Sequence, residues 1–348
     1  MDMLPIGAIA ALIGLATGSV LGLAARLGDF CTLGAIESAV YGEDQTRLRL
    51  WGIVLGTAIF TTFLFSGAGL IDLSQTIYHS IAWNPLASII GGLVFGYGMA
   101  LAGNCGYGAL VRFGGGDLRA LVVVVVMGIF GFVALAGPLA NLRVFLFPQT
   151  DAAVPMGMAE LIHAQLGIPP LAFATLVAAA FVVWALSYEP LRQSPVQIGW
   201  GVAAGLSVSL AFWGTTALNQ MTFGGVLVEG HSFTAPLGRT LLWLMTSTSG
   251  GLSFAVGSVA GVLGGSFLGS GIRGHFRWEA CEDPRELGRQ VSGAALMGIG
   301  GVIALGCSLG QGVSGFATLA YSAPVTLGAI YIGAVFGLRR LIQGFQPD

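Results

Sequence analysis

The sequence contains no lysine and little charge of either sign. All 14 basic residues among its 348 residues are arginines, and charged residues make up 9% of the chain, against roughly 25% in soluble domains. Hydrophobic residues make up 55%. So few charged side chains do not supply the polar surface that a water-soluble protein of this length needs. The composition therefore predicts an all-α polytopic membrane protein.

Other absences narrow the function. No basic residue precedes the first apolar run, so we expect a retained first helix and not a cleaved signal peptide. The net charge of −2 and the lack of basic runs give no sign of nucleic-acid binding. The four cysteines, at positions 31, 105, 281 and 307, show neither CxxC nor Cys/His metal spacing. Gly114-Gly115-Gly116-Asp117 lacks the lysine of a phosphate loop, so we expect Asp117 to cap a helix. We expect no metal and no cofactor.

Nine apolar stretches are long enough to cross, or nearly cross, a bilayer. They lie at about residues 4–26, 50–70, 85–104, 118–138, 169–187, 197–213, 251–270, 291–306 and 324–338. Three apolar segments are too short to span and are expected to be re-entrant half-helices that protein buries, at about 29–41, 105–114 and 307–320. The stretches 72–82 and 236–249 are expected to be interfacial or partial helices.

The arginines predict the orientation. Twelve fall on one side of these spans, and only Arg143 and Arg239 fall on the other. Cytoplasmic loops carry the excess of basic residues in membrane proteins. We therefore expect a periplasmic N-terminus, a cytoplasmic C-terminus and a cytoplasmic polar loop at 271–290.

An internal repeat is expected within this single transport domain of residues 1–348. A shift of 202 residues superposes six pairs: Gly91 on Gly293, Gly96 on Gly298, Gly98 on Gly300, Ala102 on Ala304, Cys105 on Cys307 and Gly108 on Gly310. The copies, about 1–140 and 169–340, would run in opposite directions through the membrane. Inverted repeats with broken helices are a recurrent plan of transporters.

Three cysteines, Cys31, Cys105 and Cys307, lie at the predicted helix breaks with glycines nearby. Each could simply be a small buried hydrophobic residue. Apolar surroundings disfavour the thiolate that redox chemistry needs. Neutral thiols are weak donors and soft contacts, and glycines such as Gly106, Gly108 and Gly310 expose backbone N–H groups beside them. Together with helix N-termini, this arrangement suits a small sulphur-bearing anion. The scarcity of basic residues inside the spans would let that anion leave again.

The sequence resembles the YeeE/YedE family of sulphur transporters over essentially its whole length. The resemblance is carried by Arg26, Phe30-Cys31 and Gly34-Ala35, by Gly96 to Ala120, and by Met297-Gly298 and Gly306 to Gly315. It implies a bacterial inner-membrane protein that takes up thiosulfate, is not an enzyme, and has a pinched, hourglass-like centre. It also implies that Cys31, Cys105 and Cys307 pass the anion along by thiol contacts. Asn104 stands where the family more often has glycine, which leaves a selenium oxyanion or another sulphur species as alternative substrates.

The expected topology orders the thiols from Cys307 near the periplasm through Cys105 to Cys31 near the cytoplasm. Three polar residues near them each have alternative roles. Asn104 either contacts the substrate or caps a turn, and Gln311 either donates to the anion or packs. Arg26 either attracts the anion or balances Asp29. Glu37 is expected to be solvated or paired. Cys281 is expected to be a bystander thiol.

Two other function classes fit the sequence less well. A membrane thiol-dependent sulphur transferase or oxidoreductase needs a thiol beside a base or metal ligands, and the sequence shows no such cluster. A scaffold subunit would not need thiols within the membrane. The resemblance further implies a TusA-like cytoplasmic sulphur-carrier protein as a partner, with the loop 271–290 as its docking place. The sequence leaves energy coupling, oligomeric state and the choice among sulphur and selenium anions open.

Overall fold

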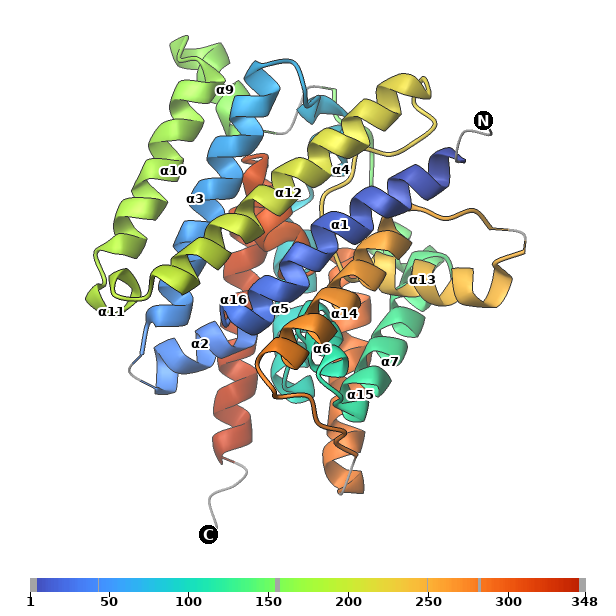
Figure 1. Ribbon diagram of the computed structural model, residues 1–348. Helices are drawn as coiled ribbons and strands as arrows, with labels where there is room; N and C mark the ends of the chain where they lie inside the picture. Colours follow the sequence, from blue (N-terminus) through green and yellow to red (C-terminus); the bar gives the residue numbers. More distant parts are fainter. Residues whose placement is uncertain (1–4, 43, 154–156, 249, 281–282, 344–348) are drawn as a thin grey trace.

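The structure, a computed structural model, describes residues 5–42, 44–153, 157–248, 250–280 and 283–343. These residues form a bundle of helices with only isolated β-bridges between loops (Figure 1). The helices are α1 (Ile6–Leu27), α2 (Thr32–Tyr41), α3 (Thr46–Gly67), η1 (Leu73–Gln75), α4 (Ile77–Ser80), α5 (Pro85–Ala102), α6 (Gly106–Gly114), α7 (Leu118–Leu135), α8 (Ala140–Leu146), α9 (Met158–Leu166), α10 (Pro170–Leu186), α11 (Glu189–Arg192), α12 (Pro195–Met221), α13 (Ala235–Thr246), α14 (Phe254–Ile272), α15 (Pro284–Ile303), the π-helix η2 (Gly310–Gly315) and α16 (Ser322–Gln343).

Seven segments of the described chain are long and apolar enough to cross a membrane. They are Ile6–Tyr41, Thr46–Gly67, Pro85–Gly114, Leu118–Leu135, Pro195–Met221, Phe254–Ile272 and Ser322–Gln343. Two of the nine expected spans fall short of this test. α10 is apolar but has only 17 residues, and α15 begins with the polar residues Arg285, Glu286 and Arg289. The multi-pass, all-α class is confirmed, with seven spanning segments by length and composition where nine were expected.

The expected short helices are present. α2, α6 and η2 occupy the three segments that the sequence predicts as half-helices, and each follows a long helix after a break. η1 and α4 lie within 72–82, and α13 overlaps the other predicted partial helix. The chain therefore interrupts its helices at the three places where cysteine stands among glycines.

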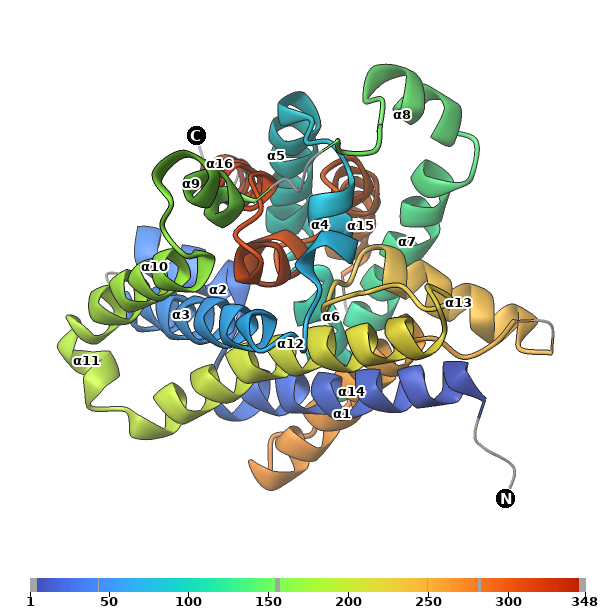
Figure 2. The ribbon, with the colours of Figure 1, turned by 90° about the horizontal axis from the view of Figure 1, so that it is seen from above.

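Glycines let the long helices approach each other closely. α1 and α14 run parallel, with Gly7 against Leu252 and Gly22 against Ser266. α5 and α15 run antiparallel, since a Cβ at Gly91 would lie 2.8 Å from the oxygen of Gly300, and one at Gly98 would lie 2.6 Å from the oxygen of Gly293. Figure 2 shows α5, α15 and α16 grouped together, while α1 lies beside α12 and α14. Small residues at such contacts bring backbones together where lipid provides no hydrophobic force between helices.

The directions of packing decide which helix ends lie together. α16 runs parallel to α5, α7 parallel to α15, α12 parallel to α3, and α10 antiparallel to α3. As a result, the C-terminal ends of α1, α5, α10, α14 and α16 gather at one end of the bundle with the N-terminal ends of α3, α7, α12 and α15. Twelve of the 14 arginines belong to this end, and we call it the arginine end.

Gly257→Ala tests the contact between α1 and α14. A Cβ at Gly257 would collide with the backbone carbonyl of Ala11, which has no room to move away. We expect this change to cost about 1–3 kcal/mol and to lower the thermal midpoint of the detergent-solubilised protein. Gly264→Ala on the same helix is the control, because a Cβ there meets nothing within 4 Å. Equal losses in both variants would contradict the proposed role of close packing.

Candidate functional site

The three expected cysteines are presented by the same local geometry. Two residues before each of them the backbone is left-handed, with φ of 57° at Asp29, 73° at Gly103 and 56° at Leu305. Glycine adopts this conformation freely and aspartate tolerates it, whereas leucine rarely does. The chain thus reverses at the end of α1, α5 and α15, and a cysteine then begins the next helical segment.

Backbone N–H groups at these helix starts are directed at sulphur. The Sγ of Cys105 accepts a hydrogen bond from the N–H of Gly108 at 3.3 Å. The Sγ of Cys307 accepts one from the N–H of Gly310 at 3.3 Å and one from the N–H of Phe233 at 3.2 Å. A neutral sulphur is a weak acceptor, so these donors remain available to a stronger one.

Hydroxyl groups connect the thiols. The Oγ of Ser232 lies 3.9 Å from the Sγ of Cys307, and Ser308, the next residue, accepts a 3.2 Å hydrogen bond from Thr32. The thiol of Cys105 donates to Thr32 at 3.8 Å. Thr32 directly follows Cys31, which is partly exposed, whereas Cys105 and Cys307 are buried. The thiols and hydroxyls therefore form one polar line through the core.

Aromatic rings surround this line. The ring of Phe30 lies 5.1 Å from Trp51 and 6.1 Å from Tyr107, and Tyr107 lies 5.5 Å from Phe233, measured between centroids. The hydroxyl of Tyr107 donates to the carbonyl of Leu21 at 2.6 Å. These large rings therefore pack around the thiols and help to fix the width of the core there.

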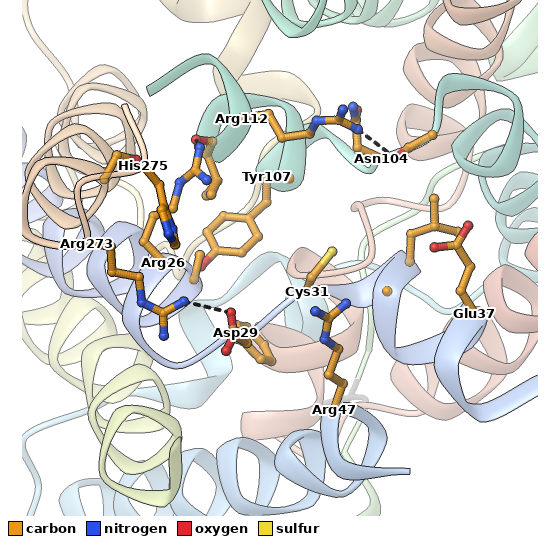
Figure 3. Close-up of a pocket in the computed structure, with 18 residues that line it drawn as sticks. Arg26, Asp29, Cys31, Glu37, Arg47, Asn104, Tyr107, Arg112, Arg273 and His275 are labelled. Atoms are coloured by element: carbon orange, nitrogen blue, oxygen red, sulfur yellow. Dashed lines mark hydrogen bonds and ion pairs between the residues drawn. The ribbon is translucent and has the colours of Figure 1, made fainter. Parts of the chain in front are cut away.

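Two cavities lie at opposite ends of the line. The larger, of about 470 Å³, opens at the arginine end, and we call it the arginine cavity. Figure 3 shows Cys31 within it, between charged side chains from several helices. The other, of about 240 Å³, is lined by Glu229, Ser232 and Arg239 among others, and we call it the Glu229 cavity. The polar line thus runs between them, from Ser232 to Cys31.

Comparison with known proteins decides the family. A family model described as sulphur transport matches residues 27–336. The chain belongs to the sulphur transport family. It is 25% identical over 322 residues to a protein of Spirochaeta thermophila named thiosulfate transporter TsuA, covering 89% of this chain and 92% of that protein. It is 26% identical over 318 residues to the Escherichia coli protein of the same name, covering 86% of each. The resemblance seen in the sequence is confirmed, and a transporter family implies a protein that is not an enzyme.

In this sulphur transport protein, Asn104 and Arg26 both line the arginine cavity. Asn104 is only 5% exposed, and its buried Oδ1 has no hydrogen-bond partner. Arg26 donates to the carbonyl of Val111 at 2.8 Å. Asp29 pairs with Arg273 at 3.1 Å and not with Arg26. Of the two roles expected for Arg26, balancing Asp29 finds no support in the ion pairs.

Gln311 is occupied within the protein. Its Nε2 donates to the carbonyls of Ala304 at 3.0 Å and Leu305 at 3.3 Å, and its Oε1 accepts from Ser322 at 3.0 Å. These bonds satisfy the carbonyls of the two residues that directly follow α15, where the helix stops. A contact between Gln311 and substrate stays a prediction, and the observed role of the side chain is to hold the break before Cys307.

Asp117 caps α7, as expected, by accepting from the N–H of Arg119 at 3.0 Å. It also forms ion pairs with Arg112 at 3.1 Å and with Arg119 at 3.0 Å. Partial burial by itself would raise the pKa of Asp117, but the hydrogen bonds and charges of the two arginines lower it below its usual value. The carboxylate therefore stays ionised and ties the end of α6 to the start of α7.

The sequence reasoning missed four functional candidates: Thr32, Ser232, Ser308 and Arg47. Thr32 and Ser308 carried a local signal, because each directly follows a motif cysteine. Ser232 comes from the distant loop before α13 and carried none. Arg47, in the first turn of α3, contributed only to the prediction of the orientation in the membrane.

Cys281 lies outside the described residues. Within the described ranges, no cluster of three or more His, Cys, Asp and Glu side chains could hold a metal ion.

Thiol labelling tests these exposures. In protein carrying Cys281→Ser, we expect a maleimide to modify Cys31 in a single fast phase, because it alone of the three remaining thiols is not buried. Peptide mass spectrometry would identify the modified residue, and Cys31→Ser should remove the fast phase. Fast modification of Cys307 would contradict the structure around that thiol.

Proposed function

We propose that the protein conducts thiosulfate across the bacterial inner membrane into the cytoplasm, with Cys307, Cys105 and Cys31 as successive contacts. One observation carries this proposal: a line of buried thiols and hydroxyls runs between two cavities. The names of both relatives as thiosulfate transporters support the substrate. The thiols act as neutral donors and soft contacts and undergo no covalent change.

The arginine end would face the cytoplasm. Basic residues concentrate on the cytoplasmic side of membrane proteins, and 12 of the 14 arginines belong to this end. The N-terminus would then be periplasmic and the C-terminus cytoplasmic. The anion would come in through the Glu229 cavity, meet Cys307 first and leave through the arginine cavity.

An inverted repeat would explain how the two central thiols come to oppose each other. α5 and α15 run antiparallel, and the shift of 202 residues exchanges their contacts: Gly91 lies against Gly300, and Gly98 lies against Gly293. Each helix ends in a left-handed residue two positions before its cysteine. In this proposal the repeat narrows the molecule from both ends, which is the pinched centre that the family resemblance implies.

Passage would require only weak interactions to break. An anion accepts hydrogen bonds more strongly than a neutral sulphur, so it would take over the N–H donors of Gly310, Phe233 and Gly108 in turn. The hydrogen bond between Thr32 and Ser308 closes the line between Cys307 and Cys105. Opening one such bond costs about 0.5–1.5 kcal/mol net, so this bond adds little to the barrier for an anion that moves down its concentration gradient.

The alternative substrates are another sulphur anion or a selenium oxyanion. The thiols and backbone N–H groups of the line respond to the negative charge and polarizability of an anion more than to its shape. A thiol-dependent sulphur transferase is the weaker alternative, since it would change the substrate chemically. A TusA-like sulphur carrier would receive the anion at the cytoplasmic side, at the loop 271–290.

Uptake of radiolabelled thiosulfate by cells with thiosulfate as sole sulphur source tests the passage. Cys31→Ala, Cys105→Ala and Cys307→Ala should each abolish uptake, because each removes a donor from the line. Thr32→Val should reduce it, because it removes the hydroxyl that joins Cys105 to Ser308. Cys281→Ala is the control and should transport normally. Normal uptake by Cys105→Ala would refute the thiol relay, and recovery of a chemically altered product inside vesicles would favour the transferase.

The Glu229 cavity predicts a dependence on external pH. Burial raises the pKa of Glu229 above its usual value, although Arg239, 3.5 Å away, offsets part of that effect. When ionised, Glu229 repels an anion and occupies Arg239. Protonation as the pH falls removes this charge, so we expect uptake to rise between neutral and mildly acidic pH. Glu229→Gln should transport faster at neutral pH and with a flatter pH profile, and Glu189→Gln, outside both cavities, should behave as the wild type. An unchanged profile in Glu229→Gln would exclude this role.

A further inference from the structure

We propose that Arg47, Asn104 and Cys31 form a binding site for a dianionic sulphur oxyanion inside the arginine cavity. We call it the Arg47 site. This inference rests on the proposed passage, because it assigns the place where the anion stops before leaving the protein. It adds a charged station to a line that is otherwise neutral.

Arg47 and Cys31 face the same small space. Gly34 in α2 lies between them: a Cβ at Gly34 would be 2.7 Å from Nη1 of Arg47 and 3.6 Å from Sγ of Cys31. Figure 3 shows Arg47 reaching from α3 toward the thiol. An anion in this space would therefore contact both the guanidinium and the S–H group.

Arg47 differs from the other arginines of the cavity in having no bond at any atom of its side chain within the described residues. Arg112 pairs with Asp117 and Arg273 pairs with Asp29, each at 3.1 Å. Arg26 donates through Nη2 to a backbone carbonyl, although its buried Nε has no partner. Within the described part of the chain, Arg47 has neither a hydrogen bond nor an ion pair, although Glu37 lines the same cavity. Its planar guanidinium can offer two parallel N–H groups to one oxyanion.

Asn104 supplies an independent sign of a missing ligand. Its side chain is 95% buried, as its exposed fraction of 5% shows, and the structure gives its carboxamide no hydrogen-bond partner among the described residues. Buried polar side chains nearly always have partners. Asn104 lines the same cavity as Arg47 and Cys31. The buried atom without a partner is its Oδ1, and a half-turn of the carboxamide exchanges that oxygen for the NH₂ group, which can donate to an anion bound there.

The charge at this position has a physical use. The central thiols are neutral and hold an anion weakly, which favours movement. A free guanidinium at the end of the line stabilises a dianion that has already passed. Cys31 is partly exposed, while the other two thiols are buried. An anion at the Arg47 site can therefore also be released into water.

Protection of Cys31 from alkylation measures this site directly. Full-length protein with Cys281→Ser would be treated with a maleimide at increasing concentrations of thiosulfate and, separately, of sulfate, which has no nucleophilic sulphur to consume the reagent. The concentration that halves the rate at Cys31, relative to the same variant without anion, reports binding. We expect Arg47→Gln to raise this concentration on the order of tenfold or more, as for loss of a charged hydrogen-bond partner.

Two further variants guard against trivial explanations. Gly34→Ala keeps every charge but places a methyl group against Nη1 of Arg47, so it should weaken protection by displacing the guanidinium. Arg49→Gln is the matched control, because Arg49 lies outside the cavity over the ring of Trp184, 4.5 Å from its centroid, and it should leave protection unchanged.

The outcomes separate this inference from the proposed function. Equal protection in Arg47→Gln and the wild type, or an equal loss in Arg49→Gln, would overturn the Arg47 site while leaving the thiol passage standing. Conversely, the protection assay detects binding without transport. If Cys105→Ala transports normally, Arg47-dependent protection of Cys31 can still be observed, and its presence would place the site on a different passage.

Discussion

The structure depends on how backbone groups are satisfied where helices break inside the membrane. In lipid an unpaired N–H group is costly in free energy. Irregular backbone therefore occurs only where protein groups or a polar cavity provide its hydrogen-bond partners. At two of the three breaks a cysteine sulphur serves the freed N–H groups, from Gly108 at one and from Gly310 and Phe233 at the other. The same atom is therefore both the cap that permits the break and the contact that a passing anion would meet. Because sulphur is a weak hydrogen-bond acceptor, it satisfies these N–H groups at the break and still leaves them available to a stronger acceptor.

Close packing of glycine-rich helices makes these breaks possible. α5 and α15 touch backbone to backbone through Gly91, Gly98, Gly293 and Gly300, so the two helices that lead to the central cysteines lie close together. Charged residues hold the chain at the arginine end instead, where Asp117 ties Arg112 to Arg119 and Asp29 ties Arg273 to the turn before Cys31. The apolar centre thus contributes shape, and the polar end contributes fixed charges around a water-accessible cavity.

The class of protein, the helix breaks and the cysteines at them were predictable, because each depends on local composition: apolar runs, and glycine beside cysteine. The cap at Asp117 was predictable for the same reason. The number of spanning segments was not, since α10 and α15 owe their place to packing and not to length or apolarity. Contacts between segments that are distant in the sequence could not be predicted either. Ser232 and Phe233 approach Cys307 from a loop some 75 residues earlier in the chain, and nothing local shows that Arg47, among the arginines of the arginine cavity, has no side-chain partner in the described residues.

The distribution of charge along the polar line agrees with the passage proposed above. A station that binds a dianion strongly at the centre would hold it there, so thiols, hydroxyls and N–H groups without formal charge suit the buried stretch from Cys307 to Cys105. At the Glu229 cavity an arginine is present, but a carboxylate 3.5 Å away competes with any anion for it. At the arginine cavity Arg47 has no such competitor in ion-pair distance among the described residues. The electrostatic attraction of the protein for an anion therefore increases from the Glu229 cavity to the arginine cavity. In the proposed passage this difference shortens the time that an anion spends in the neutral centre, and it leaves the equilibrium between the two sides of the membrane unchanged.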